Sequence, residues 1–392
     1  MSHQLINLSH DLQSLQNEGF EVKIKDGHLL ISHIPYVNTN KEIVFGTLVC
    51  ALDLSVERTA PPASHVMYFA GDTPCDYNGI PLSKILHSSQ RQILGKDIIV
   101  NHLFSSKPSC GRYADYYEKV TTYQNILSSQ AEVIDSSVTA RTFNVIESKD
   151  EESVFNYIDT NSTRAEILAI SAKLENLKIA IIGTGGTGSY ILDFVAKTPV
   201  NEIHLFDGDE FQQHNAFRTP GAPSIAKMNE KKKKVDYLHK IYSYMHKGIK
   251  PHPYSLTSLK LKELEGMSYI FICIDKGMIK KSIIEYLVSE RVPFSDVGMG
   301  LEVVDTSLRG SIRVTSATVD KNDHLQSRIS YSDGDNDEYS QNIQIAELNA
   351  LNAALAVVKW KKHFGFYCDL EKEHHTIFNV DNNQLENDEI QL

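Results

Sequence analysis

The sequence is poor in cysteine and lacks the spacings at which cysteines usually act together. Its 392 residues contain five cysteines, and no two of them form a CxxC pair. An odd and scattered set argues against a disulfide framework and against a four-cysteine zinc site. The five are Cys50, Cys75, Cys110, Cys273 and Cys368.

Positive charge in excess and long apolar runs are also missing. The formal net charge of −11 argues against non-specific binding to nucleic acid or to an anionic membrane surface. No apolar run is long enough to span a bilayer, and the first residues lack the basic and apolar regions of a signal peptide. We therefore expect a cytoplasmic protein without nucleic-acid or membrane partners, long enough for two domains.

A glycine-rich turn between two apolar strands is the most informative feature present. Lys178–Ile182 predicts a buried parallel strand, residues 190–196 a helix, and Glu202–Phe206 a second strand that ends at Asp207. The turn after the first strand contains Gly183, Gly185, Gly186 and Gly188. This order predicts an α/β fold, with a Rossmann-like, mostly parallel sheet and flanking helices.

Such a turn suits a bound polyphosphate. Glycines let the backbone approach the phosphates, and the first N–H groups of the helix donate to them. Asp207 is placed to bind a ribose hydroxyl. The same pattern serves nicotinamide dinucleotides, flavins and ATP, so it does not choose among them by itself.

The residues after the second strand narrow the choice. They follow a fixed order of Asp207, Asp209, Asn215, Arg218, a basic run over Lys231–Lys234, then Asp275 after an apolar strand over 269–274, and Lys280. This arrangement, over roughly Thr163 to Thr315, resembles the ThiF/MoeB family of adenylating enzymes, whose relatives include the ubiquitin-activating enzymes. Within the basic run, the distance to the next loop favours Lys234, while Lys231, Lys232 and Lys233 stay open.

The resemblance implies ATP and Mg²⁺ as cofactors, and adenylation of the C-terminal carboxylate of a small ubiquitin-like or sulfur-carrier protein. It implies that Arg218, Lys234 and Lys280 neutralise phosphate oxygens and that Asn215 orients one of them. Mg²⁺ would bind Asp275, with Asp209 as a second candidate ligand. These residue types suit the chemistry, because adenylation brings two anions together and depends on positioning and positive charge.

The resemblance also implies a homodimer, in which Arg164 reaches the ATP phosphates of the other subunit. The acceptor of the activated acyl group stays open. Cys75, Cys110 and Cys368 are candidates for a thioester, because Cys273 lies in an apolar strand and is expected to be an inert core residue. A separate conjugating enzyme that carries the cysteine is the alternative.

Two other functions are compatible with the sequence. An NAD-dependent oxidoreductase would use the glycine turn and Asp207, but it would leave Asn215, Arg218 and Asp275 without a role. A degenerate adenylating fold could act as a binding module. This alternative is raised by a lysine, Lys280, where the family has an arginine, and by the lack of a cysteine between Cys273 and Cys368.

The chain divides near residue 150. Residues 1–150 predict a smaller α+β domain of unknown role, similar to an uncharacterised N-terminal extension of some bacterial ThiF-like proteins, and residues 151–392 the adenylation domain. The tyrosine-rich segment 101–123 would either recognise a partner or pack within its own domain. We further expect a helix over 153–177, an exposed acidic loop over 331–338, and an apolar helix over 343–363.

Overall fold

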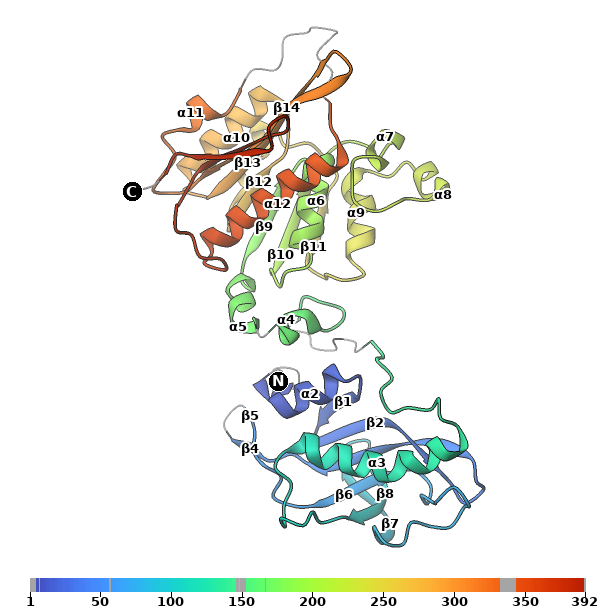
Figure 1. Cartoon of the computed structure of the whole chain (residues 1–392). Coiled ribbons are helices and arrows are strands. Elements are labelled where there is room, and N and C mark those ends of the chain that lie inside the picture. Colours follow the sequence, from blue (N-terminus) through green and yellow to red (C-terminus); the bar gives the residue numbers. More distant parts are fainter. Residues whose placement is uncertain are drawn as a thin grey trace. The chain divides into compact units, whose positions relative to one another are not determined.

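The computed structural model describes residues 5–390 apart from 7, 56–57, 146–147, 149–152, 166 and 332–342. The chain forms two compact units, the first of residues 1–147 and 159–166, the second of residues 148–158 and 167–392 (Figure 1). The division falls close to the predicted boundary, although a short segment after it belongs to the first unit. The predicted acidic loop lies outside the described residues except for Tyr331.

The first unit combines an antiparallel sheet with helices. Its six strands lie in the order β1-β2-β3-β6-β8-β7. Their bounds are β1 Glu21–Lys25, β2 His28–Val37, β3 Ile43–Ala51, β6 Val66–Ala70, β7 Leu86–Gly95 and β8 Ile98–Ser105, beside a small ribbon of β4 Leu54–Ser55 and β5 Arg58–Thr59. The helices are α2 His10–Asn17, α3 Tyr116–Ile134 and the short α4 Thr160–Arg164.

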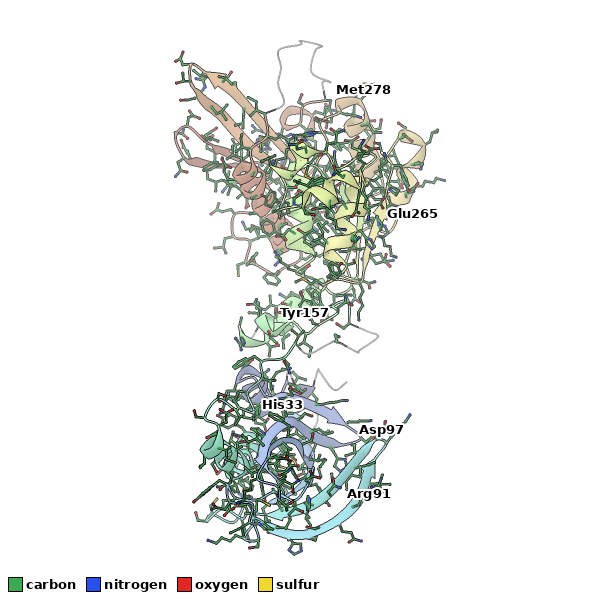
Figure 2. All side chains as sticks on the ribbon, turned by 90° about the vertical axis from the view of Figure 1, so that its right-hand side faces the viewer. His33, Arg91, Asp97, Tyr157, Glu265 and Met278 are labelled. Atoms are coloured by element: carbon green, nitrogen blue, oxygen red, sulfur yellow. The ribbon has the colours of Figure 1, made fainter. Side chains whose placement is uncertain are left out.

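Tight turns set the register of this sheet. Asp26 and Gly27 both have positive φ, which is the backbone that a two-residue hairpin turn between β1 and β2 requires. A second tight turn at Lys96 and Asp97 joins β7 to β8, with Arg91 on the edge strand β7 (Figure 2).

The tyrosine-rich segment belongs to the core of the first unit. Tyr113, Tyr116 and Tyr123 are almost fully buried. The hydroxyl of Tyr116 donates to the carbonyl of Ala51, and the hydroxyl of Tyr123 donates to that of His65. Burial with internal hydrogen bonds makes these tyrosines structural, so of the two alternatives for this segment, packing within its own domain holds for these three.

The second unit is a mixed sheet in the order β11-β10-β9-β12-β13-β14-β15-β16. The first five strands in this order, from β11 to β13, run parallel to one another. The pairs β13–β14, β14–β15 and β15–β16 are antiparallel. The strands are β9 Lys178–Ile182, β10 Glu202–Phe206, β11 Ile249–His252, β12 Tyr269–Ile272, β13 Phe294–Val304, β14 Ser307–Ala317, β15 His375–Asn379 and β16 Gln384–Asp388. The helices are α5 Leu168–Ser171, α6 Gly186–Val195, α7 Gln213–Ala216, α8 Ile225–Asn229, α9 Lys234–Tyr242, α10 Gly277–Ser289, α11 Leu325–Arg328 and α12 Ala346–His363, with 3₁₀ turns at Ala172–Leu174 and Ser258–Leu264.

Helices cover both faces of this sheet (Figure 1). Alternate residues of β9 point to opposite cores: Ile181 packs in the cluster that includes α6 and α12, and Ile182 in the cluster that includes α10. The single tryptophan, Trp360 of α12, is fully buried in the first of these clusters. The predicted α/β class with a mostly parallel sheet and flanking helices is therefore confirmed.

The prediction of one helix over residues 153–177 is wrong. Phe155 pairs with His246 as an isolated β-bridge, and only short helices follow. Asp159 caps α4, because its carboxylate accepts from the N–H groups of Asn161 and Ser162. A capping residue inside the predicted span starts a new helix there. The apolar helix predicted over 343–363 is present as α12.

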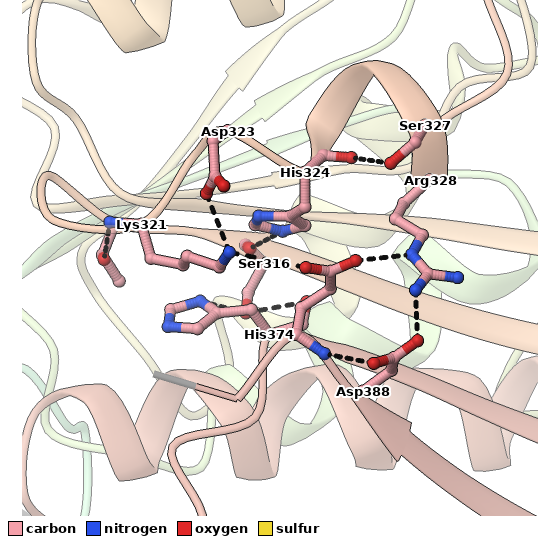
Figure 3. A network of polar contacts seen from close by, with 10 residues as sticks. Ser316, Lys321, Asp323, His324, Ser327, Arg328, His374 and Asp388 are labelled. Carbon is pink, nitrogen blue, oxygen red and sulfur yellow. Dashed lines mark hydrogen bonds and ion pairs between the residues drawn. The ribbon is translucent and has the colours of Figure 1, made fainter. Parts of the chain in front are cut away.

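A charged network ties the C-terminal strand to the sheet (Figure 3). Arg328 forms ion pairs with Asp388 and with Glu389, at 2.8 Å in the latter case. Lys321 lies 2.8 Å from Asp323 and 3.4 Å from Glu389.

Across the described residues, no helix has the length and apolar character needed to cross a bilayer.

Candidate active site

A cavity of about 980 Å³ lies where the parallel strands end. Its wall contains the ends of β9, β10 and β12, the start of α10, and parts of β13, β14 and α12. Met278, in the first turn of α10, lies at the end of the unit toward which the parallel strands run (Figure 2). Ligands in open α/β sheets bind at this edge.

Three glycines of the turn are required by the packing of the surrounding chain, independently of any ligand. Gly183 has φ +87°, and a Cβ there would lie 2.6 Å from the carbonyl oxygen of Cys273. A Cβ on Gly188 would lie 1.9 Å from the carbonyl oxygen of Gly183, and one on Gly186 2.2 Å from Nδ2 of Asn349. The turn therefore packs against β12 and α12 with no room for side chains. Helix α6 begins at Gly186, earlier than predicted, because the last glycines belong to its first turn.

Gly185 is different, because a Cβ added there would meet no atom within 4 Å. It caps the N-terminus of α6 and lines the cavity. Space above the first N–H groups of a helix is what an anionic ligand needs.

Asp207 organises the two loops beside the turn. One carboxylate oxygen accepts from the N–H of Thr184 at 2.8 Å, and the other from the N–H of Asp209 at 2.9 Å. The ammonium of Lys234 lies 3.7 Å from the first oxygen. The hydroxyl of Thr184 also donates to that oxygen, at 3.2 Å. A carboxylate has about four acceptor sites, so the three hydrogen bonds leave one for a ribose hydroxyl.

The structure distinguishes the four lysines of the basic run. Lys234 begins α9, its side chain is 9% exposed, and it lines the cavity with Nζ 2.8 Å from Asp209. That hydrogen bond holds the pKa of Asp209 below its ordinary value. Lys231 is exposed, Lys232 pairs with Glu230, and Lys233 donates to the carbonyl of Gly208.

Asn215 and Arg218 hold hydrogen-bond donors that the described residues do not satisfy. Oδ1 of Asn215 accepts from the N–H of Gln212, but its Nδ2 is buried without a partner among those residues. The same is true of Nε of Arg218. Arg218 lines the cavity, whereas Asn215 is 1% exposed and lies behind the described lining. Buried donors left in this way favour a ligand with acceptor oxygens.

Asp275 and Lys280 lie on the other side of the turn. Asp275 follows β12, is exposed and lines the cavity. Lys280 is buried on α10, and its ammonium lies 3.1 Å from Oδ1 of Asp296. The other oxygen of Asp296 accepts from Arg313 at 2.7 Å. Asp296 and Arg313 were not predicted, because their meeting depends on how β13 and β14 pair.

The remaining candidates lie elsewhere. Arg164 belongs to the first unit, where its guanidinium donates to the carbonyl of Asn17 at 2.9 Å. Cys75 is buried, which argues against it as a thioester candidate, while Cys110 and Cys368 are exposed. Cys273 is partly exposed and lines the cavity, so it is not wholly a core residue, although burial raises the pKa of its thiol.

The pair His374 and His375 does not form a metal site. Nδ1 of His374 lies 3.4 Å from the hydroxyl of Ser316, and Nδ1 of His375 lies 3.0 Å from that of Thr315. The part of the chain that the structure describes holds no group of three or more metal-ligating side chains.

The family profile of ThiF matches residues 160–377 of the chain. The chain belongs to the ThiF family. This ThiF-family chain also matches a domain of unknown function, DUF6791, over residues 10–160. Membership in the ThiF family supports an adenylyltransferase-type enzyme.

Several solved structures are similar to the ThiF-family chain. PaaA is 18% identical over 57% of this chain and 76% of its own, with a TM-score of 0.45. E. coli MccB with ATP is 18% identical over 56% and 65%, with a TM-score of 0.44. The microcin C7 biosynthetic enzyme MccB with N-formylated MccA is 18% identical over 58% and 70%, with a TM-score of 0.47. No curated protein shows significant similarity to the chain.

Proposed function

We propose that this protein adenylates the C-terminal carboxylate of a small ubiquitin-like or sulfur-carrier protein, with ATP as co-substrate and pyrophosphate as the leaving group. The observation that carries the proposal is the meeting of Arg218 and Lys234 in one cavity with the open helix N-terminus at Gly185. Unsatisfied donors on Arg218 and Asn215 add to it. Phosphate oxygens are the acceptors that such a set binds best.

The charge of the cavity supports a reaction between two anions. Cationic side chains outnumber acidic ones in its described lining, although the whole chain is acidic. The cations are Arg218, Lys234, Lys276, Lys280 and Arg313, and the acids are Asp207, Asp209 and Asp275. A carboxylate is already a nucleophile at neutral pH, so positioning and charge neutralisation would supply most of the acceleration.

Asp275 and Asp209 have the hard oxygen ligands that Mg²⁺ prefers, and both line the cavity. When bound, Mg²⁺ neutralises charge on phosphate oxygens. Asp209 is held by Lys234, which keeps it ionised. Asp275 is the stronger candidate, because it is exposed in the cavity wall just after β12, at the edge where the parallel strands end.

Transfer of the activated acyl group to a separate conjugating enzyme fits the cysteines best. Cys273 is the cysteine in the cavity wall, and burial beside Asp296 raises the pKa of its thiol, which makes it a poor nucleophile. Cys110 and Cys368 are exposed and stay as thioester candidates. As part of the proposal, the enzyme acts as a homodimer in which Arg164 approaches the ATP of the partner subunit.

An oxidoreductase would also use the glycine turn and Asp207. It would give no role to the buried donors of Arg218 and Asn215, so the geometry favours adenylation. Incubation with ATP and a panel of small carrier proteins tests the choice. We expect pyrophosphate release and a carrier heavier by one adenylate in mass spectrometry. Binding of NADH, with no adenylate on any carrier, would contradict the proposal.

A further inference from the structure

Where the β13–β14 hairpin lines the cavity, one face presents a long side chain, Arg313, beside small residues. In its antiparallel register, Asp296 pairs with Thr315, Gly298 with Arg313 and Gly300 with Ser311. Residues two apart on a strand share a face, so these six lie together. Gly298, Gly300, Ser311 and Arg313 line the cavity. The hairpin, orange in Figure 1, continues beyond the ends of the parallel strands.

Arg313 and Lys280 form a cationic pair around one acid. Asp296 has no exposed surface, and its two oxygens lie 2.7 Å from Nη2 of Arg313 and 3.1 Å from Nζ of Lys280. The lysine side chain is 7% exposed and the arginine side chain 19%. Two cations and one carboxylate carry a net charge of +1 at the cavity wall. An ammonium has three donors and a guanidinium five, so both retain donors beyond these contacts.

The guanidinium is held in one orientation. A Cβ on Gly298 would lie 2.8 Å from Nη2 of Arg313, so the guanidinium lies directly over this glycine and a side chain there would displace it. Nη1 donates to the hydroxyl of Thr315 at 2.7 Å, and that hydroxyl also contacts Nδ1 of His375 at 3.0 Å. A cation fixed in this way can bind an anion without losing much side-chain freedom.

We propose that Arg313 and Lys280 bind the terminal carboxylate of the acyl substrate, and that Asp296 is the positioning residue that holds both. This inference rests on the proposed adenylation. The net charge of +1 matches one carboxylate. We assign the triphosphate to Arg218, Lys234 and the start of α6, which line the cavity together with the ends of β9 and β10. In the strand order β9-β12-β13-β14, the strand of Arg313 lies about 14 Å from that of the glycine turn.

The glycines give the substrate a path to this pair. A Cβ on Gly300 would meet nothing within 4 Å, so the space above it is open. Gly300 lies farther along β13 than Gly298 and Asp296, away from the ends of the parallel strands. An extended peptide could therefore lie over Gly300 and Gly298 and end at Arg313. The structure thus favours a linear peptide C-terminus over a compact free acid.

Binding of synthetic peptides tests the subsite separately from catalysis. The probes are two fluorescent decapeptide pools with randomised last residues, one with a free C-terminal carboxylate and one with a C-terminal amide. We expect wild type to prefer the free acid by about 10-fold, the scale of one charge-assisted pairing. Arg313→Gln should bind both pools equally, Arg313→Lys should retain part of the preference, and ATP affinity should not change in either variant.

Gly300→Val is an independent probe, because the added Cβ meets no protein atom within 4 Å and the side chain would fill the path. It should weaken binding of both pools. Any one of three results would overturn the subsite. They are a preference for the free acid that persists in Arg313→Gln, no preference in wild type, and a loss of ATP affinity in the Arg313 variants. If the preference depends on Arg313 but no carrier or peptide is adenylated, the subsite stands and the proposed reaction fails. If a carrier is adenylated but the preference for the free acid does not depend on Arg313, the proposed reaction stands and the subsite fails.

Discussion

Single side chains in the cavity differ sharply from their neighbours in sequence. Lys234 and Lys231 are three residues apart, yet only the former is buried in the cavity wall, between Asp207 and Asp209. Lys231 is exposed, with a positive φ. A repeated residue type therefore says little about function until the helix that carries it is placed.

Lys234→Met should lower the rate of carrier-dependent ATP–pyrophosphate exchange by about 10²-fold, the scale of losing one preorganised contact to developing charge. Lys231→Met is the matched control and should leave the rate within about two-fold, as expected for an exposed side chain away from the site. Steady-state exchange rates compare the two. Equal losses of exchange rate in both variants would show that the effect is not specific to Lys234 and would contradict its assigned role.

Much of the site could be predicted at this scale, because its residues follow one another in a local order. Gly183 to Gly188, Asp207, Lys234 and Asp275 lie just after a strand or at the start of a helix, and Arg218 follows the short helix α7. Arg313 and Asp296 could not be predicted, since they meet through the register of β13 and β14. Asn349 could not either, because α12 follows the glycine turn by more than a hundred residues.

At the scale of elements, the strand–turn–helix unit at the glycine turn separates packing from binding. Gly188 lies against the carbonyl of Gly183, whereas Gly185 faces open space. The strands β9 and β10 have their predicted bounds, because short apolar runs between polar turns define them well. The helix over 153–177 failed, because its apolar stripe belongs to several short elements that pack separately.

Gly188→Ala should destabilise the second unit by about 3 kcal/mol, because its Cβ would overlap a backbone oxygen that cannot move away cheaply. Gly185→Ala should cost far less stability and yet weaken ATP binding, since its methyl group would occupy the space above the helix N-terminus. Thermal unfolding and ATP titration by calorimetry measure the two effects. Unchanged ATP affinity in Gly185→Ala would contradict this reading of the turn.

The turn after α9 makes stability depend on pH. His246 is fully buried, its Nε2 lies 2.9 Å from the carbonyl of Val200, and its Nδ1 accepts from the N–H of Gly248. Burial lowers the pKa of His246 from 6.5 to about 4. The unfolded chain therefore binds the proton first, so the contribution of His246 is present above pH 6.5 and is lost as the pH falls toward 4.

Unfolding followed by the fluorescence of Trp360 tests this, because the single tryptophan lies in the second unit. Wild type should lose up to about 3 kcal/mol from this residue between pH 6.5 and 4. His246→Gln should show a shallower loss over that range. His87→Gln, which changes an exposed histidine on β7, should follow wild type. Identical slopes in all three proteins would exclude His246 as the source.

At the scale of the whole molecule, an acidic chain concentrates positive charge in one cavity. A net charge of −11 opposes non-specific binding to polyanions, while the cavity collects cations from the segment after α7 and from α9, α10 and β14. Such a distribution suits an enzyme that must bring a nucleotide and a carboxylate together. The first unit has its own sheet and core. A role of this unit in recognising a partner stays a prediction.

The central claim is tested most directly by ATP–pyrophosphate exchange, with small ubiquitin-like and sulfur-carrier proteins as substrates. Wild type should exchange only when a carrier with a free C-terminus is present. Asp275→Ala should abolish exchange, whereas Asp320→Ala, which removes an exposed acid outside the described cavity lining, should retain it. Exchange by Asp275→Ala at the wild-type rate, or no exchange by wild type with any carrier, would contradict the account.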